Sequence, residues 1–273
     1  MTKIESMLGT VARIRKRLKG DILSLMVYGS VARGTALKAS DFDLLQLSSH
    51  PRRPYQIDNV NVSVYTPEFL SRMAIRGSLF VLHLKHDGVL VEDSEGLLSK
   101  CIETYQKPSD YSPLRSDLRI ATELLGVTEN DYLKNWISYG RISLFILRTT
   151  LYAASAEDLP PVFSISEIAR QKQDPRIEKA YNAKYLSKPD WSLFQLKISL
   201  IEEYLACTIS KTCTPEELML KHQNNELVVS LVYRLIGKSK PIDFYFAVRD
   251  HIRSLRAPKQ AMPSDLTLKD MFD

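Results

Sequence analysis

The pattern of hydrophobic and polar positions changes near residue 105. Before that point, short apolar runs of strand length alternate with stretches in which apolar residues recur every three or four positions. After the proline-bearing segment 107–113, only the three- and four-residue recurrence continues. The sequence therefore predicts an α+β domain at residues 1–107, with a small sheet and flanking helices, followed by an all-α helical bundle domain at residues 108–273.

The individual elements follow from the same periodicities. In the first domain we expect strands at 22–28, 42–47, 57–65 and 88–91, and helices at 3–18, 31–37, 67–75 and 78–85. In the second domain we expect helices at 114–126, 128–155, 164–173, 175–185, 190–210, 214–221, 225–236 and 241–254. No internal repeat interrupts this order.

A glycine and a serine directly follow the first predicted strand. Gly29 allows a positive φ and a close backbone approach. Backbone N–H groups at such a strand-to-helix corner can hold phosphate oxygens. Ser30 adds a hydroxyl donor and Arg33 a cation. This corner is therefore a candidate nucleotide-binding turn.

Two aspartates stand at the start of the next predicted strand. Asp41 and Asp43 are two residues apart, so on a strand they project from one face with their Cα atoms roughly 7 Å apart. Two neighbouring carboxylates repel each other unless a cation lies between them. Mg²⁺ favours one or two carboxylates and completes its shell with phosphates and water. Asp41 and Asp43 are thus candidate catalytic and metal-binding residues for Mg²⁺, with Mn²⁺ as the alternative ion.

The combination resembles the signature of a known superfamily. The hexapeptide Gly29-Ser30-Val31-Ala32-Arg33-Gly34, the ten-residue spacing and Ser40-Asp41-Phe42-Asp43-Leu44 are similar to the motif of DNA polymerase beta-like nucleotidyltransferases. The resemblance is specific over residues 22–47 and extends more weakly to about residue 93. It implies a small mixed sheet with flanking helices, a serine corner that holds the triphosphate of an NTP such as ATP, and two aspartates that hold Mg²⁺ for attack on the α-phosphorus.

One feature departs from that motif. The family usually supplies a third carboxylate from the next strand, and Asn61 occupies the expected position here. An amide oxygen can ligate a metal but cannot act as a general base. Two hypotheses follow: the acceptor hydroxyl is activated in another way, or the chain is a catalytically impaired nucleotide-binding regulatory or sensor module. We favour residual catalysis, because positioning and charge do most of the work in phosphoryl transfer.

Composition places the chain among globular proteins. Of 273 residues, 44% are hydrophobic and 25% are charged. No apolar run reaches the roughly 18 residues of a membrane span, and the N-terminus lacks the order of a secretion signal, so we expect a cytoplasmic protein. The three cysteines are not spaced as a zinc site or a disulfide framework. His83, His86, His222 and His251 are each interpreted as structural or surface residues.

The net charge of +5 is partly concentrated before the first predicted strand. This basic cluster is interpreted either as the solvated face of an amphipathic helix, which we favour, or as a contact surface for RNA or an acidic protein partner. Its members are Arg13, Arg15, Lys16, Arg17 and Lys19.

The two-domain layout resembles aminoglycoside nucleotidyltransferases and related bacterial toxin or toxin–antitoxin and defence proteins. That resemblance implies a transferase that moves a nucleoside monophosphate from an NTP donor to an acceptor hydroxyl. The acceptor stays open among a tRNA end, a protein side chain and a small molecule such as an aminoglycoside. The excess of basic charge favours RNA or protein over a small cationic acceptor.

Overall fold

A mixed five-stranded sheet organises the first part of the chain. The computed structural model describes residues 3–36, 41–158, 160–182, 187–211 and 213–236. Within these residues the strand order is β3-β4-β2-β1-β5. The strands are β1 (Ser24–Tyr28), β2 (Phe42–Leu47), β3 (Tyr55–Ile57), β4 (Val60–Tyr65) and β5 (Val89–Glu92). β2 and β4 are parallel and the other pairs are antiparallel, which confirms the predicted small mixed sheet.

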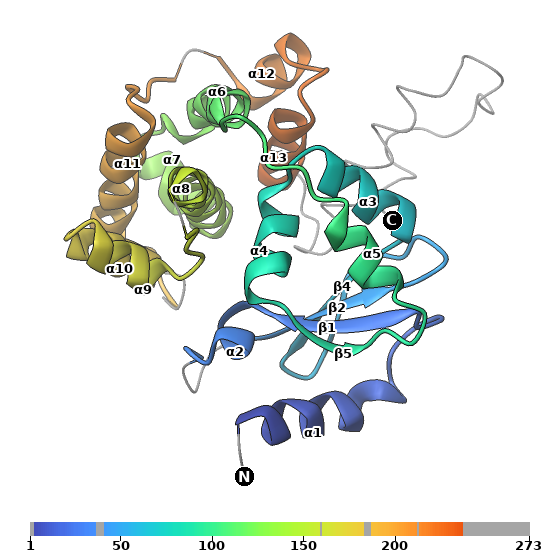
Figure 1. Ribbon diagram of the computed structural model, residues 1–273. Helices are drawn as coiled ribbons and strands as arrows, with labels where there is room; N and C mark the ends of the chain where they lie inside the picture. Colours follow the sequence, from blue (N-terminus) through green and yellow to red (C-terminus); the bar gives the residue numbers. More distant parts are fainter. Residues whose placement is uncertain (1–2, 37–40, 159, 183–186, 212, 237–273) are drawn as a thin grey trace, which may run out of the picture. The chain divides into compact units, whose positions relative to one another are not determined.

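Helices cover both faces of this sheet (Figure 1). On one face α1 (Lys3–Arg15) buries Met7, Val11 and Ile14 against side chains that include Val27 and Val62. On the other face α3 (Pro67–Ile75), α4 (Leu79–Asp87) and α5 (Leu97–Glu103) enclose a second core. This second core contains Met26, Leu45, Leu47, Leu70, Val81, Leu84 and Leu98.

The alternation along β4 decides which of its side chains reach each face. Val60, Val62 and Val64 are buried in the core beneath α1, as the sequence predicts. Because successive side chains on a strand point to opposite faces, Asn61 and Tyr65 lie on the side of α3 and α4. Asp43 shares that face, since it is the register partner of Asn61 on β2.

The described residues form two compact units. The first comprises residues 1–113 and 151–178, and the second comprises residues 114–150 and those after 178. The boundary predicted after residue 107 remains a prediction. The helices from α6 onward are α6 (Ser112–Ala121), the 3-10 turn η1 (Thr122–Leu125), α7 (Glu129–Lys134), α8 (Trp136–Glu157), α9 (Ile165–Gln171), α10 (Pro175–Asn182), α11 (Trp191–Leu205), α12 (Pro215–Lys221) and α13 (Glu226–Ile236). The helical character predicted after residue 108 is confirmed over the described residues.

Several predicted boundaries are wrong for identifiable reasons. The strand predicted at 57–65 is two antiparallel strands, because Asp58 takes a positive φ of 52° and turns the chain. The helix predicted at 31–37 is α2 (Gly29–Arg33), and Gly34 ends it in the left-handed conformation. The helix predicted at 128–155 is divided by non-helical Asn135. The helix predicted at 241–254 lies outside the described residues.

No helix in the described part of the chain has the length and apolar character needed to cross a membrane.

Candidate functional site

A five-residue helix begins where β1 ends. Gly29 is its first residue, is buried, and has a φ of +74°. A Cβ atom on Gly29 would lie 2.7 Å from Oδ2 of Asp43, well inside van der Waals contact. Both the backbone conformation and the contact therefore require glycine. Ser30 follows as the second residue of the helix and is half-buried.

Asp43 lies at the centre of a row of polar side chains across three strands. Its register partners are Tyr28 on β1 and Asn61 on β4. Nδ2 of Asn61 donates a hydrogen bond of 3.3 Å to Oδ1 of Asp43. Asp41 stands directly before β2 and is exposed. The structure thus brings Gly29, Asp43 and Asn61 together, while their roles at a nucleotide or metal site remain predictions.

The row itself offers the carboxylate of Asp43 and the amide of Asn61, and a second carboxylate, that of Asp41, stands two residues before Asp43. Among the described residues, no group of three or more His, Cys, Asp or Glu side chains is arranged to hold a metal ion. Mg²⁺ does not require such a group, because it commonly takes one or two carboxylates and leaves its other positions to water and substrate phosphates. Asp41 and Asp43 are residues of that type, and the amide oxygen of Asn61 would be a third ligand, without charge.

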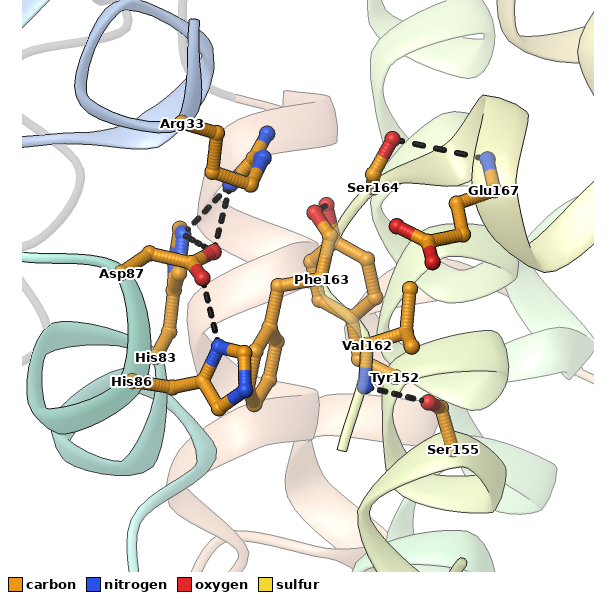
Figure 2. A network of polar contacts seen from close by, with 10 residues as sticks. All are labelled: Arg33, His83, His86, Asp87, Tyr152, Ser155, Val162, Phe163, Ser164 and Glu167. Carbon is orange, nitrogen blue, oxygen red and sulfur yellow. Dashed lines mark hydrogen bonds and ion pairs between the residues drawn. The ribbon is translucent and has the colours of Figure 1, made fainter. Parts of the chain in front are cut away.

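Arg33, the last residue of α2, reaches toward α4 (Figure 2). Its Nη1 lies 2.8 Å from Oδ2 of Asp87 and 2.9 Å from Nε2 of His83. The other oxygen of Asp87, Oδ1, lies 2.6 Å from Nδ1 of His86. The side chain of Asp87 is only 6% exposed. Burial raises its pKa, but the hydrogen bonds from His83, His86 and Arg33 outweigh burial and hold the pKa well below the usual range.

A segment from later in the chain supports His83 within the same compact unit. The imidazole of His83 stacks on the ring of Phe163, with centroids 4.9 Å apart and planes 22° apart. The hydroxyl of Tyr152 donates to the carbonyl of Phe163 at 2.9 Å, and the amide of Val162 donates to Oγ of Ser155 at 2.8 Å. These bonds fix the short connection between α8 and α9 beside the network of Arg33 and Asp87 (Figure 2).

Comparison with known protein families assigns this part of the chain. Residues 8–108 match the family model described as nucleotidyltransferase domain. Residues 8–108 form a nucleotidyltransferase domain. The match covers the later part of α1, the whole sheet, and α2 to α5. It agrees with the resemblance to DNA polymerase beta-like enzymes carried by Gly29, Ser30, Asp41 and Asp43.

Two other comparisons add less. A solved structure of a nucleotidyltransferase-like protein from Exiguobacterium sibiricum 255-15 is similar at 15% sequence identity and a TM-score of 0.28. That alignment covers 92% of this chain and 89% of the other. No curated protein matches the chain. The family match therefore carries the assignment of the domain.

Sequence reasoning missed three residues of the nucleotidyltransferase domain beside its predicted site: His83 and Asp87 contact Arg33, and His86 contacts Asp87. Asp87 was assigned no role from the sequence, and His83 and His86 were interpreted as structural or surface residues. A signal was present, since His83 and Asp87 are four positions apart and share one face of α4. Nothing in the sequence shows that this face meets Arg33, which follows Gly29 by only four residues.

The basic cluster before β1 is partly paired within the nucleotidyltransferase domain. Arg15 makes an ion pair of 2.8 Å with Glu92, and Arg17 makes one of 2.7 Å with Asp58. The ammonium of Lys19 lies 5.2 Å from the centre of the Tyr55 ring. A contact of this cluster with RNA or an acidic protein remains a prediction.

Proposed function

We propose that the chain is a Mg²⁺-dependent nucleotidyltransferase that moves a nucleoside monophosphate from an NTP to a hydroxyl of an acceptor and releases pyrophosphate. The observation that carries this proposal is the position of Asp43. It lies against the backbone of Gly29 and beside Asn61, and Asp41 precedes it by two residues. A phosphate-binding turn and two carboxylates therefore share one end of the sheet.

Each residue takes a role that its chemistry permits. The backbone amides at Gly29 and Ser30, with the Ser30 hydroxyl, hold the β- and γ-phosphates of the donor. Arg33 ends the same helix and is paired with Asp87, so it braces the turn, and its contact with the phosphates remains a prediction. Asp41 and Asp43 would hold Mg²⁺, or Mn²⁺ in its place, and a bound ion would neutralise phosphate charge that the two carboxylates otherwise repel.

The acceptor is assigned as an RNA end or a protein side chain. The net charge of +5 favours an anionic macromolecule over a small cationic compound such as an aminoglycoside. A role in bacterial defence or in a toxin–antitoxin pair would suit either acceptor. Because Asn61 is not a base, transfer is expected to be slower by about 10²- to 10⁴-fold than in an enzyme with a dedicated general base.

Asn61 also favours a second candidate function. A chain that binds NTP through Gly29, Ser30 and the two aspartates without transferring its nucleotide would serve as a sensor or regulatory subunit. The hydrogen bond from Asn61 to Asp43 supports this alternative, because it fills with a neutral donor the place where the family uses a third carboxylate.

The decisive experiment offers purified protein each of the four NTPs, labelled at the α-phosphate, with MgCl₂ and with total RNA, cell lysate or aminoglycosides. We expect the label to appear in RNA or protein. It should be lost in the variant Asp41→Asn plus Asp43→Asn. Asp158→Asn is the matched control, because Asp158 has a side chain that is 71% exposed and pairs only loosely with Lys172 at 3.9 Å.

The outcomes separate the two functions. NTP binding that depends on Asp41 and Asp43, without transfer to any acceptor, would support the sensor and exclude the transferase. Absence of NTP binding by the unmodified chain would overturn both.

A further inference from the structure

The helix that carries the nucleotide-binding turn is too short to hold its own orientation. α2 has five residues, and isolated helices of that length are unstable in water. Its direction must therefore come from contacts with the rest of the fold. At its first residue, Gly29 is fitted against Asp43. At its last residue, Arg33 is joined to α4.

The contact at Arg33 is built around one buried carboxylate. The side chain of Arg33 is 18% exposed and that of Asp87 is 6% exposed, so this ion pair is largely shielded from water. Removing one partner of such a buried pair strongly destabilises the folded protein, since the remaining charge has no compensation. Asp87 remains ionised at neutral pH, because the hydrogen bonds described above hold its pKa well below the usual range.

Burial of the Arg33 guanidinium also has an unfavourable free-energy term, which the ion pair must offset. Its Nε is buried and has no hydrogen-bond partner among the residues that the structure describes. A buried N–H group without a partner is unfavourable, whereas the same group in water is not. The guanidinium is nevertheless held in this position, where Nη1 meets both Asp87 and His83. The contacts of Nη1 with Asp87 and His83 are therefore what hold Arg33 in this buried orientation.

The two histidines keep the carboxylate of Asp87 in place. His83 lies 3.2 Å from Oδ2 and His86 lies 2.6 Å from Oδ1. The stacking of His83 on Phe163 and its edge contact with Tyr28 limit the motion of its ring. Tyr28 is the residue directly before Gly29 and the register partner of Asp43. Both ends of α2 are thus connected to one aromatic and ionic cluster.

We infer that Asp87 is a positioning residue for the nucleotide-binding turn, which acts by holding Arg33 against α4 and is itself held by His83 and His86. This inference rests on the proposed function for its effect on NTP, and it assigns to Asp87 no contact with substrate. It also gives a role to Phe163 and the segment around it, which pack beside the nucleotidyltransferase domain although they lie some 50 residues beyond it in the chain.

The test compares Asp87→Asn with the unmodified protein in MgATP and MgGTP binding by calorimetry. We expect a loss of NTP affinity of roughly 10- to 100-fold, the range typical of residues that orient a binding group. In transfer assays KM for the NTP should rise more than kcat falls. Asp174→Asn is the matched control, because the side chain of Asp174 is likewise largely buried, at 10% exposed, and pairs at 2.8 Å with Arg176 on α10. Its NTP affinity should stay within about twofold of the original.

A milder pair of variants guards against loss of folding in Asp87→Asn. His86 is 40% exposed, so its replacement should leave the core intact. We expect His86→Ala to weaken NTP binding by a few-fold, and His86→Asn to restore it, because an asparagine amide can donate to Oδ1 of Asp87 from nearly the same place as Nδ1.

Hydrogen exchange of the protein without nucleotide distinguishes failure of this inference from failure of the proposed function. Asp87→Asn should increase exchange at the amides of Gly34 and Thr35, which close the end of α2 by donating to Val31 and Ser30. Unchanged exchange in a folded variant would overturn the inference, whether or not the protein binds NTP. Increased exchange in a chain that binds no NTP would keep the positioning role and overturn the nucleotide site.

Discussion

Asn61 lies directly across from Asp43 on the neighbouring parallel strand and donates a hydrogen bond of 3.3 Å to its carboxylate. The family motif expects a third carboxylate at this place. An amide there removes charge repulsion with Asp43 and at the same time removes a candidate base. Asn61 should therefore make the metal-free protein more stable than a carboxylate would, and it should also make nucleotide transfer slower.

Asn61→Asp should reverse both effects. A third carboxylate about 4 Å from Asp43 would lower the free energy of unfolding without Mg²⁺ by about 1 kcal/mol or more. MgCl₂ should restore that loss, and the rate of nucleotide transfer should rise by roughly 10²-fold as a base becomes available. Thermal unfolding with and without MgCl₂, together with initial rates, measures the two effects.

The control for this change is Asn130→Asp on α7, where the side chain is exposed. It should alter neither the Mg²⁺ dependence of unfolding nor the rate. An Asn61→Asp protein whose stability does not respond to MgCl₂ would contradict a metal site beside Asp43.

Gly29→Ala should damage the site through the backbone. A non-glycine residue at a φ of +74° costs roughly 1–2 kcal/mol. The added Cβ would also meet Oδ2 of Asp43 at 2.7 Å and displace it. We expect a lower unfolding temperature and loss of metal-dependent NTP binding. Gly140→Ala is the control, since Gly140 lies in α8, where an added Cβ would meet no described atom within 4 Å apart from the neighbouring backbone of its own helix, and helix propensity favours alanine there.

Local sequence predicted the sheet well, because its signals are local. Alternation fixed the faces of β4, and the start of α3 is marked by Thr66, whose side chain accepts from the amide of Phe69. α5 was not predicted, because its start depends on a distant contact. Asp93 accepts from the amides of Leu98 and Ser99 while it also binds the hydroxyl of Ser24 on β1.

The site was predicted to the extent that it lies in one stretch of chain. Gly29 directly follows β1, and Asp43 and Asn61 lie on the neighbouring strands β2 and β4, so the family motif and the alternation were enough to predict that they share one end of the sheet. The network around Asp87 was not predictable in the same way. It joins α2, α4 and Phe163, and only tertiary packing determines that these three segments meet.

Asp93→Asn should weaken the hydrogen bonds by which Asp93, directly after β5, connects β1 with α5. Burial raises the pKa of Asp93, but hydrogen bonds from Ser24, Ser99 and Leu98 outweigh it and bring the pKa from 3.8 to about 2. The folded state thus binds this proton less readily than the unfolded state. Its contribution to stability is present above about pH 4 and is lost as the pH falls toward 2.

We therefore expect Asp93→Asn to lower the free energy of unfolding at pH 7 by about 1–3 kcal/mol, the range for a hydrogen bond to a charged group. Its stability should also change less between pH 4 and pH 2 than that of the unmodified protein. Urea unfolding over this pH range is the measurement. Asp158→Asn, on an exposed carboxylate, should leave the profile unchanged.

Lys197→Met should stabilise the second compact unit. Lys197 lies in α11 and is 5% exposed, and burial lowers its pKa from 10.5 to about 8 although the charge of Asp190 opposes the shift. Below pH 8 the folded state bears a buried charge, so stability should rise as the pH increases from about 8 to 10.5. Methionine fills a similar volume without the charge, and we expect a gain of roughly 1–3 kcal/mol at pH 7 in urea unfolding. The gain should shrink at pH 10, where the folded lysine is already neutral.

Lys134→Met, at a side chain that is 67% exposed, should show neither the gain nor its pH dependence. Equal stability of the Lys197→Met and unmodified proteins at pH 7 would show that the ammonium of Lys197 reaches water.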